Sequence, residues 1–283
     1  MSKFWSDNCC DLTIEQQQQL DVSLVCLPYF LDGKQVPSNI GTGFDANDFY
    51  TKMENGAKSS TSALNPQEYT EAWEPILASG EDILYLGFSH SMSGTFSNMN
   101  MAVKELLQKY PERKITTIDT QQVSLGLGIL LTLVATKRKE GAGDQDIVDF
   151  VQQIAPKFRT YATVEDLKYL KRGGRISGLT ALVGGMLNIK PILKMVDGKL
   201  IRIDKVKGRK SSLKALVQCL ESDCVDINYP IGISSAKSVD DAEQFKADIL
   251  AKYPQAQVFN QTIGPVVGSH GGPGTIALFF VSK

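Results

Sequence analysis

A strand, a hydroxyl-rich loop and an amphipathic helix follow one another directly between residues 82 and 110. Residues 82–88 are mostly apolar and end in glycine and phenylalanine, which predicts a strand. Residues 89–95 (SHSMSGT) are small and rich in hydroxyl groups, and apolar side chains recur at helical spacing from residue 96 to residue 110. In an open α/β sheet, ligands bind at such carboxyl ends of strands, where a helix N-terminus offers unpaired N–H groups to an anion. This segment therefore predicts an α/β sheet with a place for an anionic group.

The same loop also has a purely structural interpretation. Serine and threonine are preferred residues at helix N-caps, so Ser93 or Thr95 can simply cap the helix that follows. The two interpretations are compatible, because a cap and an anion site use the same backbone donors.

The two halves of the chain differ in the order of their predicted strands and helices. The first half alternates strands with helices, which is typical of βαβ units and a parallel sheet. In the second half the dipeptide Asp197-Gly198 separates two strand-like runs and predicts a β-hairpin, which helices and further strands follow. We therefore predict an α/β protein of two domains, namely an N-terminal α/β domain (residues 1–157) with a mainly parallel sheet and a smaller C-terminal α+β domain (residues 158–283) with a largely antiparallel sheet.

Three shorter segments carry local predictions. Residues 22–31 (VSLVCLPYFL) are expected to form one strand, and residues 58–62 (KSSTS) a second hydroxyl-rich loop. Residues 125–135 are apolar nearly all round, which predicts a buried helix, and the run is too short to span a bilayer.

Composition excludes some classes of function. The formal net charge of −1 over 283 residues argues against a nucleic-acid partner. The five cysteines form no CxxC pair and no even framework, and residues 1–18 contain no apolar signal-peptide core. We therefore expect a reduced, cytoplasmic protein.

The sequence offers few groups for catalysis or metal binding. Its only histidines are His90 and His270, and no cysteine or carboxylate spacing around them suggests a metal site. The nucleophile-elbow motif G-x-S-x-G is absent, and the adjacency of His90 to Ser89 and Ser91 does not by itself build a catalytic triad. The common phosphate-binding motifs are absent as well. We predict no metal, no cofactor and no catalysis by this chain alone.

A glycine-rich stretch near the C-terminus, residues 268–275 (GSHGGPGT), is a third candidate site. Its glycines let a ligand approach the backbone closely, and His270 can donate to an anion. A tight turn with an incidental surface histidine explains the same composition equally well.

Seven basic residues and one acid gather between Lys199 and Lys214, which gives this segment a local charge of +6 in a chain of net charge −1. A solvated hairpin face is one interpretation. A docking surface for an acidic partner or a phosphorylated ligand is a second. DNA binding is a third, weakened by the overall charge.

Four motifs, taken together and in this order, resemble the DegV family. They are Thr61-Ser62, then Ser93-Gly94-Thr95-Phe96, then residues 167–177 (LKYLKRGGRIS), and finally Gly268-Ser269-His270 with Gly272-Pro273-Gly274-Thr275. The resemblance covers essentially the whole chain. That family usually opens with a strand that runs into T-D-S-[TS]-[SC]-D-L, whereas residues 6–12 (SDNCCDL) retain only the aspartates and the leucine.

The resemblance implies a lipid-binding function. Members of the DegV family bind fatty acids, and in many bacteria they act as the FakB subunit of a fatty acid kinase. A long-chain fatty acid would then lie in a cleft between two domains and present its carboxylate to a separate ATP-using kinase subunit. The protein would afterwards hold the acyl-phosphate away from water. An acyltransferase and transient contact with a membrane surface are further partners that such a role allows, and the bound fatty acid replaces any cofactor.

The resemblance also assigns residues to this function. Thr61 and Ser93 would hydrogen-bond the carboxylate, and His270 would lie near the head group. The rest of the predicted head-group set belongs to the same two hydroxyl motifs and comprises Ser62, Gly94 and Thr95. The residues predicted to face the kinase or the acyl-phosphate are Arg172, Arg175, Arg202, Lys205, Lys207 and Arg209.

Burial of the acyl chain would supply most of the affinity. Burying about fifteen methylenes is worth roughly 12 kcal/mol before the costs of binding, at about 0.8 kcal/mol each. A hydroxyl that donates to the carboxylate adds about 1.5–3 kcal/mol. Because methionine adapts to a flexible chain, the helix at residues 125–135 and several methionines are candidate tunnel lining, with ordinary core as the alternative. These methionines are Met92, Met99, Met101, Met186 and Met195.

Two other classes of function stay open at this point. One is a serine esterase or thioesterase that acts on acyl substrates through Ser91 or Ser93 and a histidine. The other is a regulatory protein that binds a different amphipathic ligand.

Overall fold

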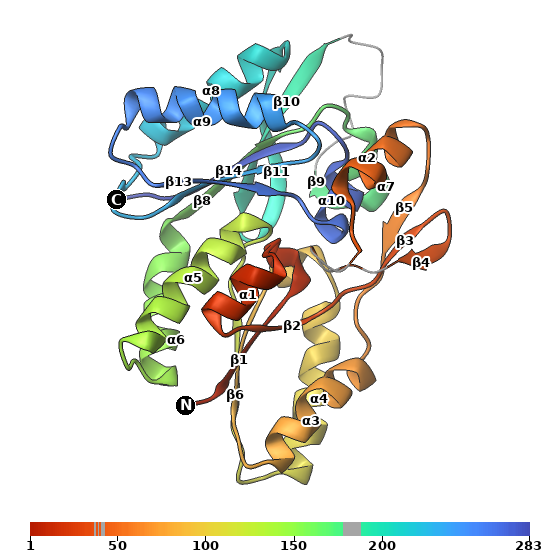
Figure 1. Ribbon diagram of the computed structural model, residues 1–283, viewed down its shortest axis with the longest axis vertical. Helices are drawn as coiled ribbons and strands as arrows, with labels where there is room; N and C mark the ends of the chain where they lie inside the picture. The colour runs from red at the N-terminus through yellow and green to blue at the C-terminus, as the bar shows by residue number, and fades with distance from the viewer. Residues whose placement is uncertain (37, 39, 41–42, 178–187) are drawn as a thin grey trace.

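The computed structural model describes the whole chain except residues 37, 39, 41–42 and 178–187 (Figure 1). The first of its three sheets is entirely parallel. Its strands follow the order β2 (Ser23–Val25), β1 (Lys3–Asp7), β6 (Ile83–Gly87) and β7 (Ile115–Asp119). Every residue of the central strand β6 is buried, in keeping with its apolar sequence. This parallel sheet confirms the prediction from the alternation of strands and helices.

The second sheet has seven strands and is mostly antiparallel. The order is β13 (Val258–Thr262), β12 (Ile231–Ser235), β14 (Ile276–Val281), β8 (Phe158–Thr163), β10 (Ile189–Val196), β11 (Lys199–Lys207) and β9 (Ile176–Ser177). Only the outermost pairs, β12–β13 and β11–β9, are parallel. The predicted hairpin is present, because β10 and β11 are joined through Asp197 and Gly198, both at positive φ.

The third sheet is small, antiparallel and ordered β4 (Lys34–Val36), β3 (Tyr29–Leu31), β5 (Ser59–Thr61). Two local predictions are wrong here. Residues 22–31 form two strands in different sheets, β2 and β3, with Pro28, which has no N–H to donate, between them. Residues 58–62 contain the strand β5 rather than a loop, because its hydroxyl-bearing residues pair with β3.

Helices cover both faces of the parallel sheet. In Figure 1, α3 (Pro66–Ala78) and α4 (Thr95–Lys109) lie on one side, and α5 (Leu125–Lys139) and α6 (Asp144–Ile154) on the other. The remaining longer helices, α8 (Arg209–Ser222) and α9 (Val239–Lys252), pack on the seven-stranded sheet. A short helix, α1 (Ile14–Leu20), follows the 3₁₀ turn at Asn8–Cys10.

Helix α5 lies between the two large sheets. Its buried side chains belong to the core of the parallel sheet, while Leu125 and Ile129 also press against Gly232 of β12. This position explains why residues 125–135 are apolar nearly all round and confirms the prediction of a buried helix. None of the helices in the described part of the chain has the length and hydrophobicity needed to cross a bilayer.

A compact group of elements joins the beginning and the end of the chain. The small sheet and α2 (Ala46–Glu54) share a core with α7 (Lys168–Gly173) and with Ile263, which precedes α10 (Pro265–Gly271). The predicted glycine-rich loop at residues 268–275 is therefore partly helical, since α10 continues to Gly271 and ends at Gly272 with φ +78°. All strands of the parallel and small sheets precede residue 157, and those of the seven-stranded sheet follow it, while the domain boundary at 157/158 stays a prediction.

Candidate functional site

A narrow cavity of about 110 Å³ lies where these groups of elements meet. The residues that line it include members of the loops after the parallel strands, of the seven-stranded sheet, of the small sheet and of α10, so the cavity is enclosed by segments distant in the sequence. Most of its lining is apolar. The apolar lining residues are Leu27, Ala63, Phe88, Met92, Val123, Ala162, Val164, Leu170, Met195, Leu200, Ile263, Val266, Val267, Ala277 and Phe279.

The wall formed by the seven-stranded sheet follows from the alternation of side chains in β-strands. Alternate residues of β8 and of β14 face the cavity, and Ala162 lies directly opposite Ala277 in the register of the two strands. Thr160 pairs with Phe279 farther along, where the Phe279 ring packs so closely on Gly126 of α5 that a Cβ there would lie 2.8 Å away. The small alanine pair thus leaves room in the middle of the channel, and Phe279 lies at the end that α5 closes.

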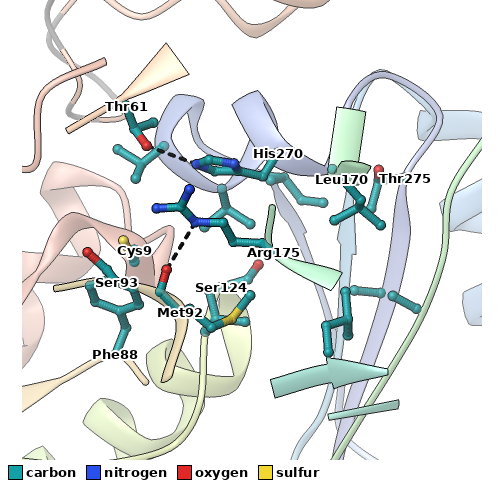
Figure 2. Close-up of a pocket in the computed structure, with 18 of the residues that line it drawn as sticks. Cys9, Thr61, Phe88, Met92, Ser93, Ser124, Leu170, Arg175, His270 and Thr275 are labelled. Carbon is teal, nitrogen blue, oxygen red and sulfur yellow. Dashed lines mark hydrogen bonds between the residues drawn. The ribbon is translucent and has the colours of Figure 1, made fainter. Parts of the chain in front are cut away.

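Polar groups gather at the opposite end of the cavity. Thr61, at the end of β5, and His270, in the last turn of α10, are joined by a hydrogen bond of 2.8 Å between Oγ1 and Nε2 (Figure 2). Ser93 also lines the cavity, and its Oγ lies 2.7 Å from the Thr95 hydroxyl and accepts from the Thr95 N–H at 3.2 Å. The N-cap of α4 is Gly94, with no side-chain cap hydrogen bond, so neither Ser93 nor Thr95 caps the helix as the structural interpretation expected. Ser93 accepts from the first helical N–H instead and lines the cavity, and its role toward an anion stays a prediction.

His270 is neutral at physiological pH. Burial, and to a smaller extent the nearby cations Arg175 and Arg172, lower the pKa of its imidazole to about 4. Nδ1 is buried without a hydrogen-bond partner among the described residues, because the backbone of Gly173 packs against it. An unpaired acceptor costs less than an unpaired N–H, so we assign the proton to Nε2, which donates to Thr61. The Thr61 hydroxyl is then free to donate its own proton to a ligand.

Arg175 places a positive charge beside these donors. Its Nε donates to the carbonyl of Met92 at 3.1 Å, and its Nη1 donates to the carbonyl of Gly173 at 2.5 Å. Figure 2 shows its guanidinium between His270 and Met92. The polar end of the cavity therefore combines a cation, free hydroxyl donors and a neutral imidazole, which is an arrangement suited to a carboxylate at the end of an apolar chain.

The sequence matches a known protein family along nearly its whole length. A family model described as "Uncharacterised protein, DegV family" matches residues 4–283. The chain belongs to the DegV family. It is 39% identical to a DegV domain-containing protein of Clostridium perfringens, across 99% of this chain and 98% of that protein. It is 31% identical to one of Streptococcus pyogenes, across 98% and 97%.

Solved structures show the same fold. A fatty acid binding DegV family protein from Streptococcus agalactiae is 25% identical and superposes with a TM-score of 0.87, covering 100% of this chain and 99% of that one. A fat acid (stearic acid)-binding protein from Eubacterium ventriosum is 23% identical, with a TM-score of 0.88 and the same coverage. The mixed α/β architecture of this DegV protein is thus that of its solved relatives.

The predicted head-group residues occupy two neighbouring places in this DegV protein. Thr61, Ser62, Ser93 and His270 all line the cavity. Gly94 instead lines an adjoining surface hollow of about 450 Å³, which shares Met92, Ser93 and Arg175 with the cavity. Thr95 is buried at the start of α4 and contacts Ser93.

The predicted partner-facing residues divide in a similar way. Arg175 lines both spaces, and Arg172, an exposed residue, stacks over the Tyr169 ring and donates to the Ser59 carbonyl at 3.4 Å. The cavity-lining residues of the described chain include none from 202–209. Lys205 and Lys207 are exposed on β11 and Arg202 is half-buried there. Arg209 is half-buried and bonded to Asp241 at 2.8 Å, so its charge is already paired within the fold.

The methionine prediction is only partly right. Met92 and Met195 line the cavity, whereas Met99 belongs to the core and Met101 is an exposed residue of α4. Met186 lies outside the described residues. Helix α5 supplies core side chains, and the cavity is lined instead by Val123 and Ser124, which precede it.

His90 and Ser91 line the adjoining hollow, and Asp119 joins them in an array whose carboxylate member was not predicted from the sequence. His90 Nδ1 lies 2.5 Å from Asp119 Oδ2, and His90 Nε2 lies 3.4 Å from Ser91 Oγ. Asp119 ends β7 and Gly87 ends β6, and the two are paired in parallel, which brings both strand ends to the same edge. The available signal was Asp119 at the end of one predicted strand and the polar run Ser89-His90-Ser91 just after the other. In the described ranges, no group of His, Cys, Asp and Glu is arranged to hold a metal ion.

Proposed function

We propose that this DegV protein binds one long-chain fatty acid, with the tail in the apolar channel and the carboxylate beside Thr61, Ser93 and His270. The observation that carries this proposal is the narrow apolar cavity that ends in hydroxyl donors and a cation. The Streptococcus agalactiae relative, described as a fatty acid binding protein, supports it because it matches this chain over its whole length.

In the proposed binding mode the tail supplies the affinity and the head group supplies the selectivity. Removal of methylenes from water supplies most of the affinity, at about 0.8 kcal/mol for each. Arg175 and the Thr61 hydroxyl then select a carboxylate, since a chain with a neutral end would leave these donors unpaired. Neutral His270 fixes the Thr61 hydroxyl and adds no second charge that the ligand must balance.

The finer part of the proposal concerns what happens to the bound carboxylate. The head group lies at the rim that the cavity shares with the surface hollow, where a separate ATP-using kinase subunit can reach it. The chain then holds the acyl-phosphate for a consuming acyltransferase, with the exposed basic residues Arg172, Lys205 and Lys207 available for docking. The absence of phosphate-cradling motifs from the sequence supports a binding role rather than phosphoryl transfer by this chain.

Mass spectrometry of the freshly purified protein tests the binding function directly. The native protein should be heavier than the denatured protein by the mass of one fatty acid, because burial of the tail makes the complex long-lived. A protein that arrives empty and takes up no added fatty acid would contradict the proposal. Incubation of the loaded protein with ATP, with and without a kinase subunit, then tests the finer part, since ATP turnover by this chain alone would refute it.

An acyl hydrolase is a second candidate, favoured by the Ser91–His90–Asp119 array. The His90 ring is oriented by Asp119 as in a catalytic triad, but Ser91 Oγ also lies within hydrogen-bond distance of the Asp197 carbonyl, at 3.2 Å, and faces the surface hollow. Stoichiometric labelling of Ser91 by a fluorophosphonate, abolished in His90→Gln, would establish this activity. Absence of labelling would remove it.

A further inference from the structure

Asp11 joins three segments of the chain behind the cavity. Its side chain is almost completely buried, with an exposed fraction of 1%. Oδ2 accepts a hydrogen bond of 2.5 Å from the Ser124 hydroxyl, and Oδ1 accepts one of 2.9 Å from the backbone N–H of Gly264. The Asp11 carbonyl also accepts from the Gln261 side chain at 2.8 Å. One residue thus ties the loop after β1 to the start of α5 and to the start of α10.

Both bonded segments form walls of the cavity. Ser124 lines the cavity itself and precedes α5. Gly264 precedes α10, whose residues Val266 and His270 line the cavity from the other side. The position of His270 opposite Thr61 therefore depends on how the start of α10 is held.

The backbone conformations of Asp11, Ser124 and Gly264 show that the surrounding structure holds these three residues closely in place. Asp11 and Ser124 both have positive φ, 57° and 58°, which non-glycine residues adopt only where the surroundings hold them. A Cβ on Gly264 would lie 2.8 Å from Asp11 Oδ1, so glycine is needed for the carboxylate to approach the N–H. The Ser124 N–H donates to the Cys9 carbonyl at 2.6 Å, which fixes the second wall to the same loop.

We infer that Asp11 is a positioning residue for the ligand, a clasp that holds the start of α5 against the start of α10 around the cavity, and that breaking of this clasp widens the cavity and speeds the exit of the fatty acid. The inference rests on the proposed fatty acid binding. It adds a specific residue, outside the cavity lining, that controls how fast the ligand leaves.

The ionisation of Asp11 predicts that the rate of fatty acid release depends on pH, which a residue with a purely structural role would not cause. The pKa of Asp11 is raised to about 7, because burial, with a smaller contribution from the carboxylate of Asp7, outweighs the opposing effect of the hydrogen bonds from Ser124 and Gly264. The titratable side chains that face it are Asp7, Cys9 and Cys10 on its own loop and Tyr50 on α2, and all four are acids. Ser124, Ser234 and Gly264 contribute only neutral groups from α5, β12 and α10.

The direction of the pH effect follows from linkage. In the closed state Asp11 binds its proton with a pKa near 7, whereas a carboxyl that becomes hydrated when the clasp opens returns toward 3.8. Protonation therefore favours the closed state, and a rise of pH through 7 favours opening. Fatty acid release should accelerate by roughly tenfold between about pH 6 and pH 8 if opening limits release. His270 does not titrate in this window, since its pKa is about 4.

Asp7 offers a matched control in the same loop. It is equally buried, and burial raises its pKa to about 6. Its partners, however, are the Cys9 N–H, the Tyr85 hydroxyl and the Phe88 N–H, none of which comes from the far wall of the cavity. Asp7 should therefore stay buried when the clasp opens and should not control release.

The experiment measures the release of a fluorescent fatty acid by stopped-flow displacement, for the wild type, Asp11→Asn and Asp7→Asn, between about pH 6 and pH 8. Asparagine can keep the clasp, because its Oδ1 accepts from Gly264 and its Nδ2 donates to Ser124, whose hydroxyl turns to Ser234 at 3.0 Å. Asp11→Asn should therefore release the fatty acid slowly at every pH, and Asp11→Ala should release it fast at every pH. Asp7→Asn should keep the wild-type dependence of the release rate on pH. Thermal unfolding checks that each variant is folded.

Each outcome distinguishes the inference from the function on which it rests. Wild-type protein that binds no fatty acid refutes the proposed function and the clasp with it. Wild-type protein that binds, together with an Asp11→Asn variant that keeps the pH-dependent slope, refutes the clasp alone. Loss of the pH dependence of release in Asp7→Asn would also refute the role of Asp11, because any acidic residue of this loop would then have the same effect.

Discussion

Thr61 Oγ1 and His270 Nε2 lie 2.8 Å apart although 209 residues separate them in the sequence. The bond joins the last residue of β5 to the last turn of α10, and it turns the threonine hydroxyl into a donor with a fixed direction. A small antiparallel sheet and a glycine-rich helix thus build one half of the head-group site, and the hydroxyl loop before α4 supplies the other half through Ser93.

Replacement of Thr61 by valine should weaken fatty acid binding without changing the shape of the site. The variant loses one hydrogen bond to a carboxylate, worth about 1.5–3 kcal/mol, so the dissociation constant should rise by roughly 10- to 150-fold. Isothermal titration with one fatty acid measures this. Thr136→Val, an exposed position on α5, is the control and should bind normally. Unchanged affinity in Thr61→Val would remove Thr61 from the site.

Gly173→Ala should disturb the hydrogen bond between Thr61 and His270, because Gly173 packs against the other ring nitrogen of His270. A Cβ at Gly173 would lie 2.2 Å from His270 Nδ1, which forces the imidazole away from Thr61. Binding should fall by at least as much as in Thr61→Val. Gly143→Ala is the matched control, because it lies at the start of α6 outside the cavity lining, its φ of −78° suits alanine, and a Cβ there would lie at an ordinary contact distance of 3.5 Å from Asp146 Oδ2. Equal binding by the two variants would show that the position of His270 is unimportant.

The ionisation of the His270 imidazole should make the free energy of unfolding depend on pH. Burial, and then Arg175 and Arg172, lower its pKa to about 4 from 6.5, so the unfolded chain binds the proton more readily between these values. The stabilising contribution of the neutral form is complete above pH 6.5 and is lost as the pH falls toward 4. Urea unfolding of the wild type and His270→Gln should therefore diverge across this window, by up to about 1.4 kcal/mol per pH unit. Parallel pH profiles would place His270 in a hydrated environment.

Features set by neighbouring residues were predictable, and features set by distant ones were not. The strand, loop and helix around Ser93 follow from apolar spacing over a few turns, and the hairpin at Asp197-Gly198 follows from turn chemistry. The helix α10 was missed because glycine has poor helix propensity, and tertiary packing on Tyr50 and Tyr169 overrides that propensity. The strand β5 was missed because its residues Ser59–Thr61 look like a loop until β3 pairs with them.

The site shows the same division. Shared motifs pointed to Thr61, Ser93 and His270, but spacing along the chain says nothing of which hydroxyl meets which imidazole. Asp11 and Ser124 gave a weaker signal, since an aspartate among small polar residues such as those of residues 6–12 (SDNCCDL) is equally typical of a turn. Their pairing depends on two positive-φ positions and on the missing side chain of Gly264, and only the folded chain brings these together.

The alanine pair in the seven-stranded sheet should set the length of acyl chain that the cavity accepts. Thr275 lies beside Gly271 at the polar end and directly precedes β14. Phe279 lies at the end closed by α5, about 14 Å farther along the strand direction at 3.4 Å per residue. Ala277 stands midway and faces Ala162, so Ala277→Leu should fill the channel between them. Long saturated fatty acids should then bind at least tenfold more weakly, with a smaller loss for short ones that end before the new side chain. Competition with saturated fatty acids of increasing length measures this, and Ala215→Leu, half-buried on α8 away from the cavity, is the control. An equal loss of affinity at every length would mean that the tail does not run past Ala277.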